Sequence, residues 1–502
     1  MLKGFYVMHS SAEGLGSAIG SDQAERAMHP GRVVILAPTA WGLRNMVLSG
    51  ALERLRDTLG SVTVLASSQA NNALAEEWRA DDTQSEPLVR SSRTPVGLIP
   101  YTVSALLHAS FGQRHDIASY RIFGRWRRRD ASRWQQLRYD GLRGLATVTG
   151  RQPFYGWQVR YLERACLRTP AAAEVVEQLQ RLRPTLLVST SCVVSDEVPY
   201  ILAARRLGIP TLGCILSFDN LTSKSVLPTF DSYAVWAQRM GDEVLRYYPD
   251  RDARRIHVTG SPQFDFHRST EYRWTRDRTL RELGLGPGDR YILYAANCAA
   301  YTPTEPALIA TFADACDRTP SLRDHKIIVR PHPADDPGRW AGVAALHAQI
   351  RLAPPRDVGT PFATAEAQAR LVSSILHADV CLNMASTMTL DAAILDTPVV
   401  CVGFALEAGS EEDWLAGACY RTEHFEPVAA SGGVRLARGM EDLVQYTASY
   451  VDDRSRDRAG RAKLVEDICG VADGRAGERV ANLIVQLATE GDREGPSAGR
   501  RS

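Results

Sequence analysis

Short apolar runs alternate with stretches of helical periodicity along most of this chain. In the first half the runs cover residues 32–38, 62–68, 185–191, 209–217, 232–238 and 256–260. In the second half they cover residues 291–297, 326–333, 350–355, 379–383 and 399–404. The runs at 32–38 and 399–404 show little polar alternation, which is typical of strands buried on both faces of a parallel sheet. The pattern therefore predicts an α/β protein with doubly wound parallel sheets.

The length of 502 residues is too great for one hydrophobic core, so two domains are expected. The first is expected at residues 31–260, with a helical insertion at about 70–183. A charged segment that contains Pro and Gly, residues 261–288, is expected to link it to a second domain at residues 289–490, which ends in closing helices. We expect residues 1–30 and 491–502 to be disordered.

The composition narrows the classes of partner and compartment. The chain has 59 Lys and Arg against 58 Asp and Glu, so no overall field favours nucleic acid as a partner. Nine cysteines are scattered without a CxxC pair, which indicates free thiols in a reducing compartment rather than disulfides or zinc. No apolar stretch reaches 18 residues, and we therefore expect a cytoplasmic protein.

The stretch from residue 376 to residue 404 carries the strongest functional signal. It is predicted to form a strand, a tight loop, a helix, a turn and a strand, with Ser386 as the N-cap of a helix that begins at Thr387. A helix N-terminus at the carboxyl end of a strand favours an anion, often a phosphate. Thr387 and Asp391 share a helix face. The spacing suits a nucleoside diphosphate, with phosphates at Ser386 and Thr387 and ribose hydroxyls at Asp391. The alternative is an ordinary capped helix.

Several segments resemble a known superfamily. RPHP (330–333), the helix from Ser386 to Asp391 and DGRAGERVA (473–481) resemble bacterial surface and capsular polysaccharide glycosyltransferases of the GT-B fold, and the related CDP-glycerol glycerophosphotransferases and UDP-N-acetylglucosamine 2-epimerases. SFDNLTSK (217–224) resembles the S-W-D-N-L-T-x-K loop of a subgroup. The resemblance implies two Rossmann-like domains that face each other across a cleft, with the nucleotide donor on the second domain and the acceptor on the first.

The resemblance also implies roles for residues of the second domain. Arg330 and His332 end a strand beside the cleft, where they would neutralise the diphosphate leaving group. Asn297 lies where this fold meets the phosphates with backbone amides, and His424 lies in a segment that contacts the donor phosphate. A structural role is the alternative for both histidines. Asp391 stands where related families commonly have glutamate.

In the first domain, polar residues follow two strands on the expected cleft side. Arg44 and Asn45 lie after the first strand and are expected near the acceptor. Asp219, Asn220 and Lys224 lie in the SFDNLTSK loop, and Asp219 is a candidate general base for an acceptor hydroxyl. Lys224 is one of only four lysines in the chain. The alternative is a structural loop in which Asp219 caps the following turn.

Residues 121–138 form a strongly basic run that contains Trp126 and Trp134. One interpretation is a solvated helix face. The other is an interfacial patch attracted to anionic lipid, which would hold the protein peripherally at the inner face of the membrane.

Together these features predict a metal-independent glycosyltransferase that moves a sugar from a nucleotide-diphosphate donor to a glycan or lipid-linked acceptor, in surface polysaccharide or glycoconjugate biosynthesis. No metal is expected because no D-x-D pair lies in a suitable loop, and the nucleotide-sugar is expected as substrate without a further cofactor. Three alternatives remain: a polyol-phosphate transferase with a CDP-linked donor, a nucleotide-sugar 2-epimerase, and a non-catalytic GT-B scaffold.

Overall fold

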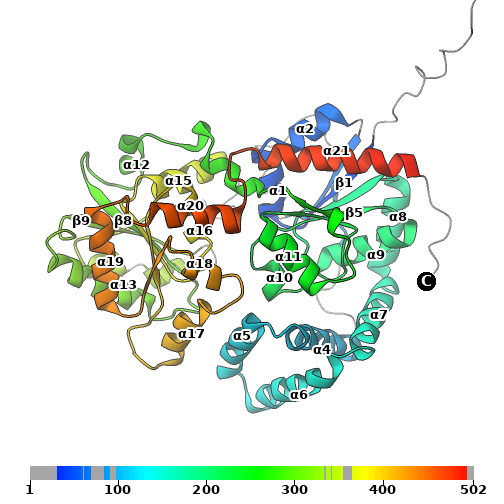
Figure 1. The fold of residues 1–502 in the computed structure, drawn as a ribbon, viewed down its shortest axis with the longest axis horizontal. Coiled ribbons are helices and arrows are strands. Elements are labelled where there is room, and N and C mark those ends of the chain that lie inside the picture. The colour runs from blue at the N-terminus through cyan, green and yellow to red at the C-terminus, as the bar shows by residue number, and fades with distance from the viewer. Residues whose placement is uncertain are drawn as a thin grey trace, which may run out of the picture.

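Two parallel β-sheets, each surrounded by helices, organise the protein (Figure 1). The computed structural model describes residues 31–59, 61–68, 70, 84–90, 98–332, 335–340, 342–353 and 364–494. Every strand pairing in the described residues is parallel. The prediction of an α/β protein with two doubly wound sheets is confirmed. The expected disorder of residues 1–30 lies outside the described residues.

The first sheet has seven strands in the order β3-β2-β1-β4-β5-β6-β7. Chain order reverses between β1 and β4, so the loops after these two strands border the crevice where ligands bind in such sheets. The strands are β1 (Arg32–Ala37), β2 (Ser61–Ala66), β3 (Gln84–Pro87), β4 (Leu186–Ser189), β5 (Thr211–Cys214), β6 (Ser232–Val235) and β7 (Ile256–Val258).

The second sheet has six strands in the order β10-β9-β8-β11-β12-β13, and its reversal lies between β8 and β11. The strands are β8 (Arg290–Ala295), β9 (His325–Arg330), β10 (Ile350–Leu352), β11 (Val380–Asn383), β12 (Val399–Val402) and β13 (Arg435–Ala437). The apolar pattern did not predict β3 or β13, because both are short edge strands that contain polar residues.

The helices of the first domain pack around its sheet. They are α1 (Ala40–Leu48), α2 (Ala51–Thr58), α8 (Pro170–Leu182), η1 (Ser195–Glu197), α9 (Val198–Leu207), α10 (Asn220–Ser223), α11 (Gln238–Tyr247) and η2 (Ala253–Arg255). Gly50, with φ +72°, separates α1 from α2. Only glycine adopts this backbone region without steric cost, so one helical stretch becomes two.

The insertion consists of α4 (Leu98–Arg114), α5 (Ala118–Arg129), α6 (Arg133–Thr149) and α7 (Phe154–Leu167). In Figure 1, α5 reaches towards the second domain and α6 lies at the outer edge of the molecule. A capping box between Ser132 and Gln135 begins α6. This arrangement separates a helix that bridges the domains from one that faces outwards.

The expected linker is itself helical, with η3 (Pro262–His267), η4 (Thr270–Tyr272) and α12 (Arg276–Glu282). The helices of the second domain are α13 (Glu305–Asp317), η5 (Pro337–Trp340), α14 (Val343–Leu346), α15 (Ala365–Leu376), α16 (Met388–Ile394), α17 (Glu411–Cys419), α18 (Glu426–Ala430), α19 (Met440–Asp452), α20 (Arg458–Leu464) and η6 (Val465–Cys469).

The last helix, α21 (Ala476–Glu494), crosses back to the first domain (Figure 1). Its buried side chains, such as Val480 and Ile484, share a hydrophobic cluster with Val33 and Ile35 of β1. The range 289–490, expected to form the second domain, therefore includes a helix that packs on the first. The helix also continues to Glu494, past the expected start of a disordered tail at residue 491.

Candidate functional site

The loop after β11 is folded around the side chain of Asn383. Its Oδ1 accepts hydrogen bonds from the N–H of Ser386 at 3.2 Å and from the hydroxyl of Thr389 at 2.9 Å. The Ser386 hydroxyl accepts from the N–H of Met388 at 3.3 Å. The helix therefore begins at Met388, and Thr387 takes the N-cap position without a side-chain capping bond. The prediction of Ser386 as N-cap is wrong by one residue, because Asn383 organises the turn.

Asp391 of α16 connects the second domain to the first. Its Oδ1 lies 3.0 Å from Nε2 of His267, which ends η3 and is 2% exposed, while the Asp391 side chain is 16% exposed. Arg44 of α1 is buried nearby: burial lowers the pKa of its guanidinium to about 10, and the attraction of Asp391 opposes that shift. Arg44, which was expected near the acceptor, and Asp391, which was expected at the ribose, thus lie close together. We call this group the Arg44–His267–Asp391 cluster.

Aromatic and amide groups hold Arg44 in place. Its guanidinium lies 5.4 Å from the centroid of the Phe266 ring, a cation–π distance. Its Nε and Nη2 donate to Oδ1 of Asn45 at 3.1 and 2.7 Å. Asn45 therefore positions the guanidinium that faces the second domain.

Arg330 and Asn383 lie at the same edge of the second sheet. Ala295 of β8 is in register with both residues, with Arg330 on one side and Asn383 on the other. Because adjacent strands are roughly 5 Å apart, the two backbones are separated by about 10 Å. His332 follows two residues after Arg330. The structure thus brings three of the predicted donor residues, Arg330, Ser386 and Thr387, to one edge of the sheet.

Asn297 uses its polar groups inside the loops. Its backbone N–H donates to the Glu305 carboxylate at 3.0 and 3.1 Å, and its side-chain amide donates to the carbonyl of Met384 at 3.4 Å. Its Oδ1 accepts from the N–H of Cys298. The Asn297 N–H, expected at the donor phosphate, instead binds Glu305 at the start of α13, and the side-chain amide joins the β8 loop to the β11 loop.

The loop from residue 217 to residue 224 contacts the second domain through His424. The hydroxyl Oγ1 of Thr222 lies 3.2 Å from Nδ1 of His424, and the Phe218 ring meets the His424 ring edge-on at 5.1 Å. Both Thr222 and His424 are buried. Burial lowers the pKa of His424, although the negative charges of Asp219 and Glu423 oppose that shift. His424 therefore lies in an interdomain contact with the SFDNLTSK loop.

Asp219 is held within this loop. Its carboxylate accepts from the hydroxyl of Ser223 at 2.7 Å and from the amide of Asn220 at 3.4 Å. Burial raises the pKa of Asp219, but the net shift is downward. The pKa is lowered by the charges of Lys224 and His424 and by hydrogen bonds from Ser217 and Ser223. The Asp219 side chain makes no capping bond to the backbone of α10. A carboxylate with a lowered pKa is a weak base.

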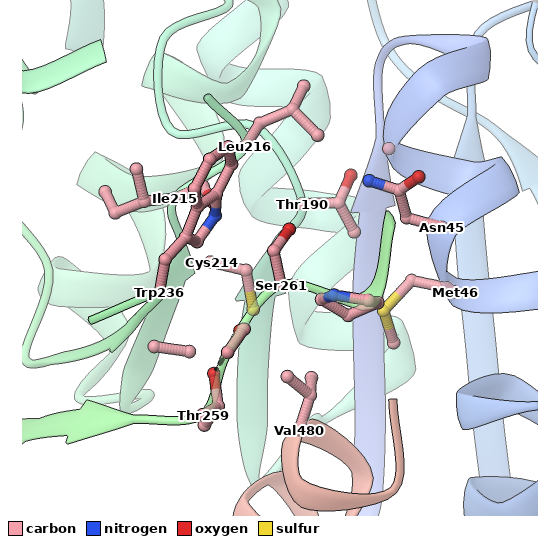
Figure 2. A pocket seen from close by; sticks show the side chains of 14 residues that line it. Asn45, Met46, Thr190, Cys214, Ile215, Leu216, Trp236, Thr259, Ser261 and Val480 are labelled. Atoms are coloured by element: carbon pink, nitrogen blue, oxygen red, sulfur yellow. Dashed lines mark hydrogen bonds between the residues drawn. The ribbon is translucent and has the colours of Figure 1, made fainter. Parts of the chain in front are cut away.

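A small pocket with a cavity volume of about 30 Å³ lies at the carboxyl edge of the first sheet (Figure 2). Figure 2 shows Asn45 and Thr190 on one side and Trp236 on the other. The indole N–H of Trp236 donates to the carbonyl of Ile215 at 2.8 Å, which fixes the ring. None of the residues that line the pocket in the described structure is Asp, Glu, His, Lys or Arg. The pocket therefore suits an uncharged group.

The basic run at residues 121–138 divides between two surfaces. Trp126 is buried, and its indole N–H donates to the carbonyl of Ala300 at 3.1 Å. Arg125 donates to Glu411 at 2.7 Å and stacks on the Trp414 ring at 3.8 Å. The prediction that Trp126 belongs to a lipid-facing patch is wrong, because α5 packs on α17. Trp134 is 82% exposed.

Sequence reasoning missed His267 and Glu423. The Glu423 carboxylate accepts from the N–H and the hydroxyl of Ser119 at 3.1 and 2.7 Å and from the N–H of Ala118, so it caps α5 from the other domain. His267 is a lone histidine after Phe266, and no local signal in the sequence points to its contact with Asp391. No local signal marks Glu423, because its partner is a helix of the insertion.

No group of three or more His, Cys, Asp or Glu side chains in the described ranges is arranged to hold a metal ion. None of the helices described is both long and apolar enough to cross a bilayer.

Two parallel doubly wound sheets whose carboxyl-edge loops contact each other define the GT-B fold. Solved structures with this fold are similar to the chain. A UDP-N-acetylglucosamine 2-epimerase aligns with a TM-score of 0.50 and 13% identity over 95% of this chain and 99% of its own. The epimerase from Neisseria meningitidis, solved bound to UDP-GlcNAc, aligns with a TM-score of 0.51 and 10% identity over 91% of this chain and 100% of its own. A putative UDP-N-acetylglucosamine 2-epimerase from Listeria monocytogenes aligns with a TM-score of 0.51 and 14% identity over 92% of this chain and 97% of its own.

Neither protein-family models nor curated protein sequences match the chain. At 10–14% identity the structural likeness establishes the fold.

Proposed function

We propose that this protein is a nucleotide-sugar-dependent glycosyltransferase that acts without a metal ion. The observation that carries the proposal is the Arg44–His267–Asp391 cluster, in which a carboxylate on the expected donor helix meets cationic and imidazole groups of the first domain. Neither ring nitrogen of His267 makes a hydrogen bond within the described residues. Buried polar groups without a hydrogen-bond partner are uncommon, which marks the contact between His267 and Asp391 as a candidate for function.

The donor would bind at the carboxyl edge of the second sheet. The Asp391 carboxylate would accept hydrogen bonds from ribose hydroxyls, while Ser386 and Thr387 would contact the diphosphate. Arg330 and His332 would neutralise the charge that develops on the departing nucleoside diphosphate. A nucleotide-sugar donor is consistent with the fold, since the Neisseria meningitidis epimerase of similar fold was solved with UDP-GlcNAc.

The acceptor would bind on the first domain, at the pocket that contains Asn45. Its lining is uncharged, and its cavity volume of about 30 Å³ would take one hydroxyl of the acceptor rather than a whole sugar ring. Asn220 and Lys224 would border it from the SFDNLTSK loop. We assign Asp219 a positioning role, because its lowered pKa makes it a poor general base and its carboxylate is bound within the loop.

A nucleotide-sugar 2-epimerase is the second candidate function, favoured by the structural neighbours. Epimerisation moves a proton at carbon 2 of the sugar and therefore needs an acid–base group beside that carbon. The pocket lining offers none among its described residues, but His267 and Asp391 are ionisable groups that meet between the domains. The deuterium experiment below therefore decides between the two functions.

Two measurements test these proposals. Thermal shift with UDP, GDP, CDP, CMP, TDP and ADP identifies the nucleotide, because a ligand at 100 times its Kd adds about 2.7 kcal/mol to stability. One diphosphate that raises the melting temperature supports the transferase, whereas CMP as effective as CDP supports polyol-phosphate transfer. Incubation with UDP-GlcNAc in D2O then separates the remaining enzymes: deuterium at carbon 2 identifies an epimerase. If no nucleotide raises the melting temperature, every nucleotide-dependent function is contradicted. The non-catalytic GT-B scaffold is then the remaining interpretation.

A further inference from the structure

One face of α6 is apolar and exposed to solvent. Trp134 is 82% exposed, Leu137 62%, Leu145 50% and Val148 53%. Because an α-helix has 3.6 residues per turn, these four side chains lie on one face of α6. Gly141 lies on the same face, between Leu137 and Leu145. An amphipathic helix normally turns such a stripe towards the core. Here α6 lies at the outer edge of the molecule, away from both sheets (Figure 1).

Two aromatic side chains are also exposed on α7, which follows α6 after a short loop. Phe154 is 52% exposed and Trp157 is 53% exposed, one helical turn apart near the start of that helix. We call the surface formed by Trp134, Leu137, Leu145, Val148, Phe154 and Trp157 the α6–α7 face. Large exposed apolar surfaces on a folded protein mark interaction sites.

The surroundings of the α6–α7 face are strongly basic. Residues 127–160 contain eight arginines and two acidic residues, Asp130 and Asp140, which leaves a net charge of +6. Each aspartate is paired with an arginine of α5, Asp130 with Arg129 and Asp140 with Arg128. The exposed Arg133 and Arg138 of α6 border the apolar stripe, whereas Arg143 lies on the opposite face of the helix.

We propose that the α6–α7 face docks on an anionic lipid bilayer. Tryptophan and phenylalanine at the level of the headgroups, aliphatic side chains between them and arginines around them form the pattern of a helix that lies in a membrane interface. Each arginine near an anionic surface adds electrostatic attraction that salt weakens. The docking surface is thus α6 and α7, not α5, whose Trp126 is buried against the second domain.

Two other occupants fit the observations less well. A second copy of the chain bound through the same face would bring two arginine-rich surfaces together, and like charges repel. Single-stranded nucleic acid would attract the arginines and stack on the aromatic rings, but Leu137, Leu145 and Val148 would stay exposed. A bilayer covers both the aliphatic and the charged groups.

Docking in this way would place the crevice between the domains near the lipid surface. The insertion is bound to loops at the carboxyl edge of the second sheet, through Trp126 to Ala300 and through Ser119 to Glu423. These contacts link the docked helices to the candidate site. The proposal itself does not depend on the proposed function, because vesicle binding needs no substrate.

Flotation of the full chain with vesicles tests the proposal. We expect binding to phosphatidylcholine vesicles that contain phosphatidylglycerol, little binding to phosphatidylcholine alone, and release at high salt. Trp134→Ser with Leu137→Ser should weaken binding about tenfold or more, and Arg133→Glu with Arg138→Glu should weaken it on the anionic vesicles only. Leu346→Ser is the matched control, because Leu346 is 64% exposed on α14 of the second domain and should leave binding unchanged.

Circular dichroism and melting temperature should be unchanged in all variants, since every substituted side chain is exposed. Absence of binding to anionic vesicles overturns the proposal. Equal binding of the Trp134→Ser/Leu137→Ser variant and the wild type overturns it as well. A dimer in size-exclusion chromatography with light scattering that this variant dissociates assigns the face to a second copy instead.

Discussion

Nε2 of His267 lies 3.0 Å from Oδ1 of Asp391, and this contact joins the segment that leaves the first domain to the helix that follows β11 in the second. The two groups are close but not aligned as a hydrogen bond. Arg44 adds a buried positive charge to the same place. Three residues from three parts of the chain therefore meet where a nucleotide between the domains would expose its ribose.

Asp391 should govern nucleotide affinity. Asp391→Ala is expected to weaken the nucleotide about tenfold to 100-fold, because a hydrogen bond to a charged group contributes about 1.5–3 kcal/mol. Asp391→Glu keeps the carboxylate and should retain most of the affinity. Isothermal titration with the nucleotide that gives the largest thermal shift measures both. Equal affinities of Asp391→Ala and the wild type would remove the ribose assignment.

Arg330 should govern turnover rather than folding. Arg330→Ala is expected to lower donor turnover about 100-fold or more, because it removes charge stabilisation of the leaving group. Arg290→Ala is the control: Arg290 lies at the opposite end of the second sheet, in a partly exposed ion pair with Asp379, and should cost at most about 1 kcal/mol. Nucleoside diphosphate release is the assay. Wild-type turnover by Arg330→Ala contradicts the phosphate assignment.

The contact between Thr222 and His424 should couple the two domains. In a double-mutant cycle of Thr222→Val and His424→Ala, urea unfolding should give an interaction energy of about 0.5–1.5 kcal/mol. The contact is buried, and its 3.2 Å distance is that of a hydrogen bond. Additive effects of the two substitutions would show that the loops are merely adjacent.

Glu197 should make stability depend on pH. Its carboxylate accepts from the hydroxyls of Ser189 and Ser191, and burial raises its pKa from 4.5 to about 7. The folded protein therefore keeps a proton that the unfolded protein loses above pH 4.5, so this contribution to stability is lost as the pH rises towards 7. One pKa unit corresponds to about 1.4 kcal/mol, so the loss is on the order of 3 kcal/mol.

Glu197→Gln removes this proton equilibrium. Its melting temperature relative to the wild type should rise between pH 5 and pH 8, whereas Glu53→Gln, an exposed change on α2, should show no such trend. Burial also raises the pKa of Glu305 to about 7. Because Glu305 is present in both proteins, part of the dependence of stability on pH remains in the variant. Parallel pH profiles for Glu197→Gln and the wild type would contradict the assignment.

The last helix should stabilise the first domain. Ile484 is fully buried in the cluster that contains β1, and Ile484→Ala should cost about 2–5 kcal/mol of the free energy of unfolding. Val471, 56% exposed, is the control, and Val471→Ala should stay within about 0.5 kcal/mol. Urea denaturation followed by circular dichroism measures both. An unchanged midpoint for Ile484→Ala would mean that α21 does not support the sheet.

Sequence and structure agree most closely where the signal is local. Runs such as 32–38 and 379–383 predict β1 and β11, because strands buried on both faces must be apolar along their whole length. Short edge strands such as β3 and β13 lack that signal.

The candidate site was predicted in part. Ser386, Thr387 and Arg330 were expected at the carboxyl edge of one sheet, and their strands place them there. His267 was missed, because a lone histidine after an aromatic residue predicts no partner. Asn297 was expected at a phosphate, but its N–H is bound to Glu305, which follows eight residues later. Hydrogen bonds of this kind depend on loop conformation, which residue types do not specify.

The sequence by itself determined the strands, the doubly wound plan and the loops in which polar residues gather, because periodicity and burial act over a few neighbouring residues. Only the tertiary structure decided which of these loops meet. It placed Asp391 against His267, turned Trp126 towards the second domain while Trp134 stayed exposed, and returned α21 to the first sheet. Such contacts join residues far apart in the chain, and the packing of whole elements rather than local composition selects them.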